Sequence, residues 1–207
     1  MRPLPRVHAV TSGDILRLPD LGVRAAAIAA AGSAVVLHVR DHGAEGRRLA
    51  DLTRRFLALA GPPEAAVMVN GHPEIARGCG AQGVQLRTTD LTPRDARTIL
   101  VQGWIGCSVH DMPQAEDAAS NGADFLIAGS VYPTATHPGQ APGGLALVRQ
   151  CTTLGIPVIA IGGVTVARVE ELRDAGAYGV AAVSGLWHAA DPAAATQAML
   201  DPWSTLQ

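Results

Sequence analysis

The chain has 207 residues, of which 48% are hydrophobic and 16% are charged, and its net charge is −2. This composition is typical of a compact globular protein and excludes a disordered chain. The chain has no basic block and only 3% aromatic residues, which excludes a nucleic-acid-binding surface built on charge and base stacking. All 16 basic residues are arginines, so lysine chemistry such as Schiff-base formation is excluded as well.

The sequence predicts one domain over residues 1–207 and a cytoplasmic location. Cys79, Cys107 and Cys151 are far apart and outside any CxxC motif, as expected for reduced thiols. The first residues lack the apolar core of a signal peptide, and the longest apolar stretches are too short for a membrane span or contain Gly and Pro. We therefore expect no membrane partner.

Short apolar runs rich in β-branched residues predict eight strands. In chain order they are 7–10, 34–39, 65–70, 83–86, 104–109, 124–129, 157–162 and 179–184.

Segments with helical spacing separate most of these runs. The clearest is 44–60, where Leu49, Leu52, Phe56 and Leu59 form one apolar stripe. Proline at 93, 113 and 192 is expected in first helical turns, and glycine at 32, 80, 122, 155 and 176 at helix ends before strands.

Eight strands that alternate with helices predict a parallel sheet. In a chain of this length we expect a closed (β/α)8 TIM barrel, with an open doubly wound sheet as the alternative.

In such a barrel the active site lies at the carboxyl ends of the strands, so polar residues there are the candidates. They are His38, Arg40, Asn70, Gln85, Ser108, His110, Thr134, Thr136, His137, Gly162, Gly163 and Ser184.

Two loops, 162–165 and 183–185, follow the last two strands and can offer backbone N–H groups to a phosphate. The structural alternative is that their glycines only allow tight turns. Because neither loop contains Lys or Arg, binding would depend on backbone amides and a helix dipole.

Arg40 and His110 are the candidate charged and proton-transferring groups. Arg40 shares a strand face with Val36 and His38, where it could bind an anion or form a structural ion pair. His110 directly follows a strand and can accept and donate protons, although a lone His is more often structural. The chain has no HxH or HExxH motif, so we expect no metal site.

Several segments, in order from His8 to Leu186, resemble the thiamine phosphate synthase/TenI superfamily. They are VHAVTSGD, VVLHVRDHG, VMVNGHPEIARGCGAQGVQL, GCSVHDMPQAEDAASNGADFLIAGSVYPTATHP and PVIAIGGVTVARVEELRDAGAYGVAAVSGL. The resemblance implies a TIM barrel that acts on phosphorylated thiazole or pyrimidine compounds.

Departures from the synthase pattern favour the TenI-like thiazole tautomerase branch. The synthase uses Mg²⁺ and carries Asn-Asp-Arg where this chain has Asn70-Gly71-His72, and only Asp90 could match its second metal-binding Asp. His42 and His137 stand where the synthase has lysines. The resemblance therefore implies an isomerase that aromatises a carboxylated thiazole phosphate without a cofactor, and Mg²⁺ is expected only for a synthase.

The resemblance also implies roles for residues. His110 would transfer the proton and His38 would assist, with thiazole phosphate as the small-molecule partner. The other expected binding residues are Arg40, Asn70, Thr134, Thr136, Gly144, Gly162, Gly163, Val183 and Ser184. The alternatives are a thiamine phosphate synthase and a non-catalytic thiazole-phosphate binder. The roles of His42, His72 and His137 are left open, and the Ala-rich surface is compatible with a monomer or a homodimer.

Overall fold

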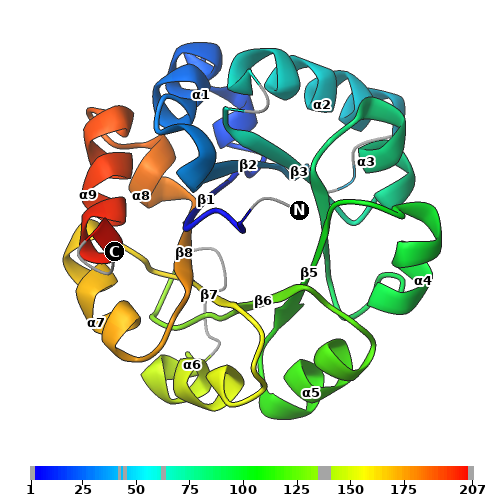
Figure 1. The fold of residues 1–207 in the computed structure, drawn as a ribbon. Helices are drawn as coiled ribbons and strands as arrows, with labels where there is room; N and C mark the ends of the chain where they lie inside the picture. Colours follow the sequence, from blue (N-terminus) through cyan, green and yellow to red (C-terminus); the bar gives the residue numbers. More distant parts are fainter. Residues whose placement is uncertain (1–2, 42, 44–45, 62–63, 135–140, 205–207) are drawn as a thin grey trace.

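Eight parallel strands form a closed barrel, and the helices surround it (Figure 1). The computed structural model describes residues 3–41, 43, 46–61, 64–134 and 141–204. The strands are β1 Val7–Val10, β2 Val35–Val39, β3 Ala66–Asn70, β4 Gly83–Leu86, β5 Trp104–Val109, β6 Phe125–Ala128, β7 Val158–Ile161 and β8 Gly179–Ala182.

The α-helices lie on the outside of the barrel, where α1 to α7 connect successive strands and α8 and α9 follow β8. They are α1 Leu21–Ala29, α2 Gly46–Ala60, α3 Pro73–Cys79, α4 Pro93–Ile99, α5 Met112–Ser120, α6 Gly144–Thr152, α7 Val169–Asp174, α8 Ser184–Trp187 and α9 Pro192–Ser204. In the described part of the chain, three short 3₁₀ turns complete the order, namely η1 Ile15–Arg17, η2 Gly32–Ala34 and η3 Val166–Arg168.

The predicted (β/α)8 barrel is confirmed, and the open-sheet alternative is wrong. β8 pairs with β1, with Val180 opposite Val7 and Ala182 opposite Ala9, so the sheet has no open edge. The strands lie within one or two residues of the predicted runs. Each run is largely apolar because one face of the strand is buried in the barrel interior and the other is buried under the helices.

Local signals for helix ends are also confirmed. Pro93 begins α4 and Pro192 begins α9, as expected for a residue whose φ suits a first helical turn. Gly80 ends α3 in the left-handed conformation, with φ +77°. At Gly32 the structure differs from the prediction, because α1 ends at Ala29 and Gly32 begins the 3₁₀ turn η2.

Two layers of side chains fill the molecule. One lies inside the barrel and includes Val36, Met68, Phe125 and Ile159, and a larger one lies between the strands and the helices. The filled interior leaves the barrel ends as the places where a ligand can enter. Among the described residues, no helix is both long and apolar enough to cross a membrane.

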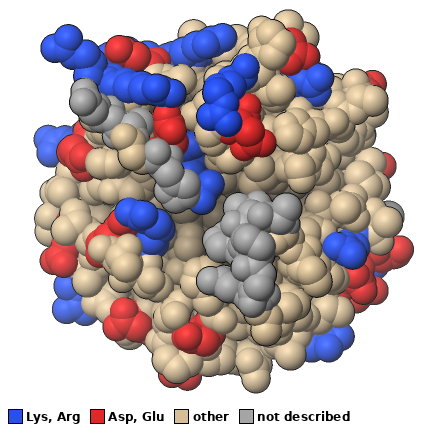
Figure 2. Space-filling view, turned by 180° about the vertical axis from the view of Figure 1, so that it is seen from behind, with Lys and Arg blue, Asp and Glu red and all other residues tan. Residues whose placement is uncertain are grey.

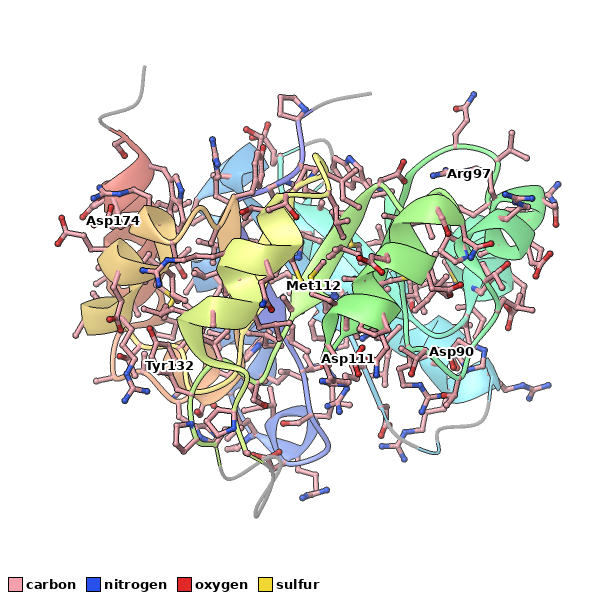
Figure 3. All side chains as sticks on the ribbon, turned by 90° about the horizontal axis from the view of Figure 1, so that it is seen from below. Asp90, Arg97, Asp111, Met112, Tyr132 and Asp174 are labelled. Carbon is pink, nitrogen blue, oxygen red and sulfur yellow. The ribbon has the colours of Figure 1, made fainter. Side chains whose placement is uncertain are left out.

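The two ends of the barrel carry different loops (Figure 3). Asp90, Asp111 and Tyr132, which follow β4, β5 and β6, lie toward one end, and Arg97 and Asp174 lie toward the other. The first of these ends is formed by the carboxyl ends of the strands and is called the mouth below.

Candidate functional site

A cavity of about 420 Å³ opens at the mouth and is lined by residues that follow or end all eight strands. In Figure 2 the surface is hollowed near the middle of the face, and arginine side chains lie beside the hollow. Most predicted site residues line the cavity, namely His38, Arg40, Asn70, Gln85, Ser108, His110, Thr134, Gly162, Gly163, Val183 and Ser184. Gly144, the first residue of α6, does not line it, and Thr136, His42 and His137 lie outside the described residues.

The loop after β7 has a backbone that only glycine adopts without strain. Gly162 has φ +100° and Gly163 has φ +65°. A Cβ atom on Gly162 would lie 2.6 Å from the Cβ of Ser130, and one on Gly163 would lie 2.8 Å from the carbonyl oxygen of Pro133. The two glycines therefore let this loop lie directly against the loop that follows β6.

Donors from neighbouring residues hold both carbonyl groups of the glycine loop and so fix its backbone. The N–H of Tyr132 donates to Gly162 O at 3.0 Å, and Arg168 Nη1 donates to Gly163 O at 2.6 Å. Ser184 begins α8, where the first N–H groups have no partner within the helix. Because α8 and η3 are short, the helix dipole contributes less here than the sequence suggested, and the amides themselves carry the site.

Two buried histidines connect the floor of the cavity to the amino end of the barrel. His8 Nε2 lies 3.1 Å from Pro5 O, His8 Nδ1 lies 2.8 Å from His38 Nε2, and His38 Nδ1 lies 3.3 Å from Asn70 Oδ1. Burial lowers the pKa of His38 to about 4, and the positive charge of Arg40 acts in the same direction. Burial, with the neighbouring His38, also lowers the pKa of His8 well below its usual value. Both rings are therefore neutral near pH 7.

The carbonyl group of Pro5, at one end of this series of hydrogen bonds, decides which atoms donate and which accept. Pro5 O can only accept, so a neutral His8 donates from Nε2 and accepts at Nδ1 from the Nε2–H of His38. His38 Nδ1 is then an acceptor as well, so it cannot bond the Oδ1 of Asn70. Half a turn of the Asn70 amide brings its NH₂ group to His38 and leaves its oxygen for the cavity. This contact lets His38 hold the Asn70 amide in place, and the proton-transfer role suggested by the sequence stays a prediction.

His110 follows β5 and lies at the exposed part of the mouth. Its Nδ1 contacts the carbonyl oxygen of Gly129, and its backbone N–H donates to Gln114 Oε1 at 2.9 Å. Because the carbonyl only accepts, Nδ1 carries the ring hydrogen and Nε2 of the neutral ring is an acceptor. His110 can therefore accept a hydrogen bond or a proton at Nε2.

The side of the mouth next to β3 carries two arginines, Arg40 after β2 and Arg87 after β4. Burial, and secondly the positive charge of Arg87, lower the pKa of Arg40. Arg87 binds both carboxylate oxygens of Asp90, with Nη2 at 2.7 Å from Oδ1 and Nε at 3.3 Å from Oδ2. This ion pair raises the pKa of Arg87.

The described residues of the mouth do not fit a resident Mg²⁺ ion. Two carboxylates line the cavity, and each is already paired with an arginine, Asp41 with Arg48 at 3.1 Å and Asp90 with Arg87 at 2.7 Å. Within the part of the chain that the structure describes, no three His, Cys, Asp or Glu side chains form a group that could hold a metal. A divalent cation would have to displace an arginine from its carboxylate before binding it.

Arg87 and Ser130 line the cavity but were missed in the sequence. Arg87 directly follows β4, and Ser130 lies two residues after β6. A search for polar residues at the carboxyl ends of strands finds both if it includes the two residues after each strand. His72 also lines the cavity, and its ring pairs with Glu74 at 2.8 Å.

Comparisons with known proteins agree on one family. A family model described as thiamine monophosphate synthase matches residues 8–186. The thiamine-phosphate synthase of Salinispora tropica is 39% identical over 207 residues, which cover 97% of this chain and 98% of the relative. That of Thermus thermophilus is 37% identical over 173 residues, 83% of this chain and 84% of the relative. The solved structure of a thiamine phosphate pyrophosphorylase from Pyrococcus furiosus has a TM-score of 0.80 and 27% identity, and covers 97% of this chain and 96% of that one.

These relatives contradict the expected thiazole tautomerase, and with it the isomerase class, because they are named as synthases. The expectation rested on a few mouth positions where charged residues of the synthase pattern are missing, such as Gly71. It overlooked Arg87, a charge that this chain places at the same mouth, beside Asp90. The match to the synthase model extends far beyond those positions, over residues 8–186. The chain therefore belongs to the thiamine monophosphate synthase family.

Proposed function

We propose that this chain is a thiamine-phosphate synthase, which joins a pyrimidine diphosphate to a thiazole phosphate and releases pyrophosphate. The observation that carries this proposal is the presence of anion-binding groups on two opposite sides of one cavity. Backbone groups at Gly162 and Ser184 lie on the side of β7 and β8, and the guanidinium groups of Arg40 and Arg87 flank β3 across the barrel. Two anionic substrates could thus bind with their uncharged parts meeting between these sides.

The glycine loop is the proposed site for the phosphate of the thiazole substrate. A monoester phosphate needs several N–H donors that converge on it, and the backbone at Gly162, Gly163, Val183 and Ser184 offers them at the ends of neighbouring strands. A neutral loop of this kind binds phosphate with little attraction for cations.

The arginine side is the proposed site for the diphosphate. When the bond between the pyrimidine compound and the diphosphate breaks, negative charge develops on the leaving pyrophosphate while a new bond forms to the thiazole phosphate. Fixed guanidinium groups stabilise such charge without reorganising during the reaction. Arg87 is fixed in this way by its two contacts with Asp90.

Three further side chains are proposed to orient the uncharged parts of the substrates. Asn70 offers its amide oxygen, Thr134 its hydroxyl and His110 its Nε2 atom, and all three line the cavity. Mg²⁺ is included in the test because the resemblance of the sequence to the synthase pattern implies it for a synthase. The cytoplasmic location, a homodimer and the extent of one domain over 1–207 stay predictions of the sequence.

The test is a coupled assay with a pyrimidine diphosphate, thiazole phosphate and Mg²⁺. We expect thiamine phosphate, detected by chromatography, and pyrophosphate in equal amounts, and no pyrophosphate when thiazole phosphate is omitted. Binding of both substrates without product would refute the proposal and leave a non-catalytic binder. Pyrophosphate without thiamine phosphate would refute it as well, because the chain would then be a hydrolase.

A further inference from the structure

The turn from Arg87 to Asp90 is a compact ion pair at the rim of the cavity. The backbone N–H of Arg87 donates to Asp90 Oδ2 at 2.8 Å, and the side chain binds the same carboxylate through Nη2 and Nε. The Asp90 side chain is only 9% exposed, whereas that of Arg87 is 60% exposed. The carboxylate is therefore saturated by one arginine, which still has N–H groups on the solvent side.

Gly71, in the loop after β3, lies against this carboxylate. A Cβ atom on Gly71 would be 3.5 Å from Asp90 Oδ2, and the residue has φ +79°. In the synthase pattern an aspartate stands at this position, so a side chain here would bring a second carboxylate beside Asp90. Two adjacent carboxylates require a cation between them, whereas Asp90 alone is neutralised by Arg87. In this chain the position beside Asp90 carries no second carboxylate, and the charge next to Asp90 is the guanidinium of Arg87.

Arg40 faces the same part of the cavity from the neighbouring side of β3. The positive charge of Arg87 acts on it strongly enough to lower its pKa, in addition to burial. Two guanidinium groups that repel each other across a cavity are stabilised when an anion binds both of them. Their planar donors match phosphate oxygens, which can be bound by two parallel hydrogen bonds.

We propose that Arg40 and Arg87 bind the diphosphate group directly, with Arg87 supplying the positive charge that a Mg²⁺ ion would otherwise provide. The inference deepens the proposed synthase function and rests on it for the identity of the natural ligand. Its consequence is that diphosphate binding to this chain does not require a divalent cation.

The experiment is a titration of the full chain with inorganic pyrophosphate, followed by calorimetry, once with EDTA and once with excess Mg²⁺. Wild-type protein should bind in EDTA with a dissociation constant within about threefold of that in Mg²⁺. Arg87→Gln should weaken binding in EDTA by about ten- to a hundredfold, because it removes charge-assisted hydrogen bonds to phosphate oxygens. The matched control is Arg94→Gln, an exposed arginine of α4 that does not line the cavity, and it should bind like wild type.

Arg87→Lys is a second variant for the same pyrophosphate titration if Arg87→Gln does not fold. Lysine keeps the charge and loses the planar fork, so binding in EDTA should fall by less than in Arg87→Gln and by more than in the control. Wild-type binding that requires Mg²⁺, or Arg87 variants that bind in EDTA as tightly as wild type, would overturn the inference.

The two proposals fail in different ways. Pyrophosphate binding that depends on Arg87 and not on Mg²⁺, with no thiamine phosphate formed, would refute the synthase and leave the anion site standing. Thiamine phosphate formation together with pyrophosphate binding only in Mg²⁺ would refute the arginine site and leave the synthase standing.

Discussion

Substitution of Gly162 by alanine tests the proposed phosphate loop most directly. The added Cβ would lie 2.6 Å from the Cβ and 2.7 Å from the Cα of Ser130, at a residue with φ +100°. The variant therefore combines two costs, a backbone conformation that alanine resists and a clash with backbone atoms that cannot rotate away. Relief of the clash must move the loop after β7, and with it the N–H groups that line the cavity.

Gly122→Ala is the matched control, because it places alanine in an unfavourable backbone conformation without causing a clash. Gly122 has φ +85° at the end of α5, and a Cβ there would meet no heavy atom within 4 Å. For a residue with a Cβ the left-handed conformation costs about 1–2 kcal/mol. In a chain of this size each kcal/mol lowers Tm by roughly 2–4 °C, so the control should melt about 2–8 °C below wild type.

Gly162→Ala should lose at least as much stability and, in addition, phosphate affinity. Loss of one hydrogen bond to a charged group is worth about 1.5–3 kcal/mol. Since about 1.4 kcal/mol corresponds to a factor of ten, thiazole phosphate should bind at least tenfold more weakly to Gly162→Ala. The Gly122→Ala control should bind it like wild type.

The assay is calorimetric titration with thiazole phosphate, together with thermal melting of the three proteins. The reasoning is wrong if Gly162→Ala binds thiazole phosphate as tightly as wild type. It is also wrong if both variants lose affinity equally, because the effect would then come from general destabilisation and not from the loop.

Four further predictions concern other parts of the molecule. The pKa of His38 is about 4 in the folded protein, against an ordinary value of 6.5 for histidine. The unfolded chain therefore binds more protons between these pH values, and stability should fall as pH drops from about 6.5 to 4. Urea unfolding at pH 7.5 and 5 measures this, and an unchanged free energy of unfolding would contradict it. Long-range ¹H–¹⁵N NMR should place the ring hydrogen on Nε2 of both His8 and His38. A hydrogen on Nδ1 of either ring would contradict the donors and acceptors assigned to the hydrogen bonds between these residues. His110→Ala should lower kcat/KM of the synthase assay by about two- to tenfold, the value of one hydrogen bond between uncharged groups, while a variant as active as wild type would exclude His110 from substrate contact. Phe56→Ala removes a fully buried ring whose centroid lies 6.1 Å from that of Trp187 and should cost about 3–5 kcal/mol in urea unfolding, and a loss below about 1 kcal/mol would contradict this packing.

The barrel could be predicted because its signals are local. Each strand is a short apolar run, each helix carries its own period, and residues such as Pro93 and Gly80 mark helix boundaries within a few residues of themselves. The location of the site followed from the barrel, because parallel strands bring all their carboxyl ends to one face. Eleven of the predicted site residues therefore line the cavity, and Gly144 does not, because it belongs to α6 on the outside of the barrel.

The branch of the family could not be read from individual positions. Gly71 and the missing lysines suggest a loss of charge when each is considered alone. Only the structure shows that Arg87 and Asp90 form an ion pair beside Gly71, and that Arg40 is close enough for its pKa to respond to Arg87. A sequence gives the number of charges, whereas their effect depends on which of them lie within a few ångströms of one another.

By itself, then, the sequence determined the strands, the helices, the closed barrel and the end at which ligands bind, since each depends on patterns within about twenty residues or on the common direction of the strands. Tertiary structure alone decided the contacts between separate elements. His8 meets His38 because β1 pairs with β2, and Gly162 meets Ser130 because the loops after β6 and β7 lie against each other. Such contacts fix which ring nitrogen carries a hydrogen, which carboxylate is neutralised and which N–H groups remain for an anion, and they depend on distances between residues far apart in the chain.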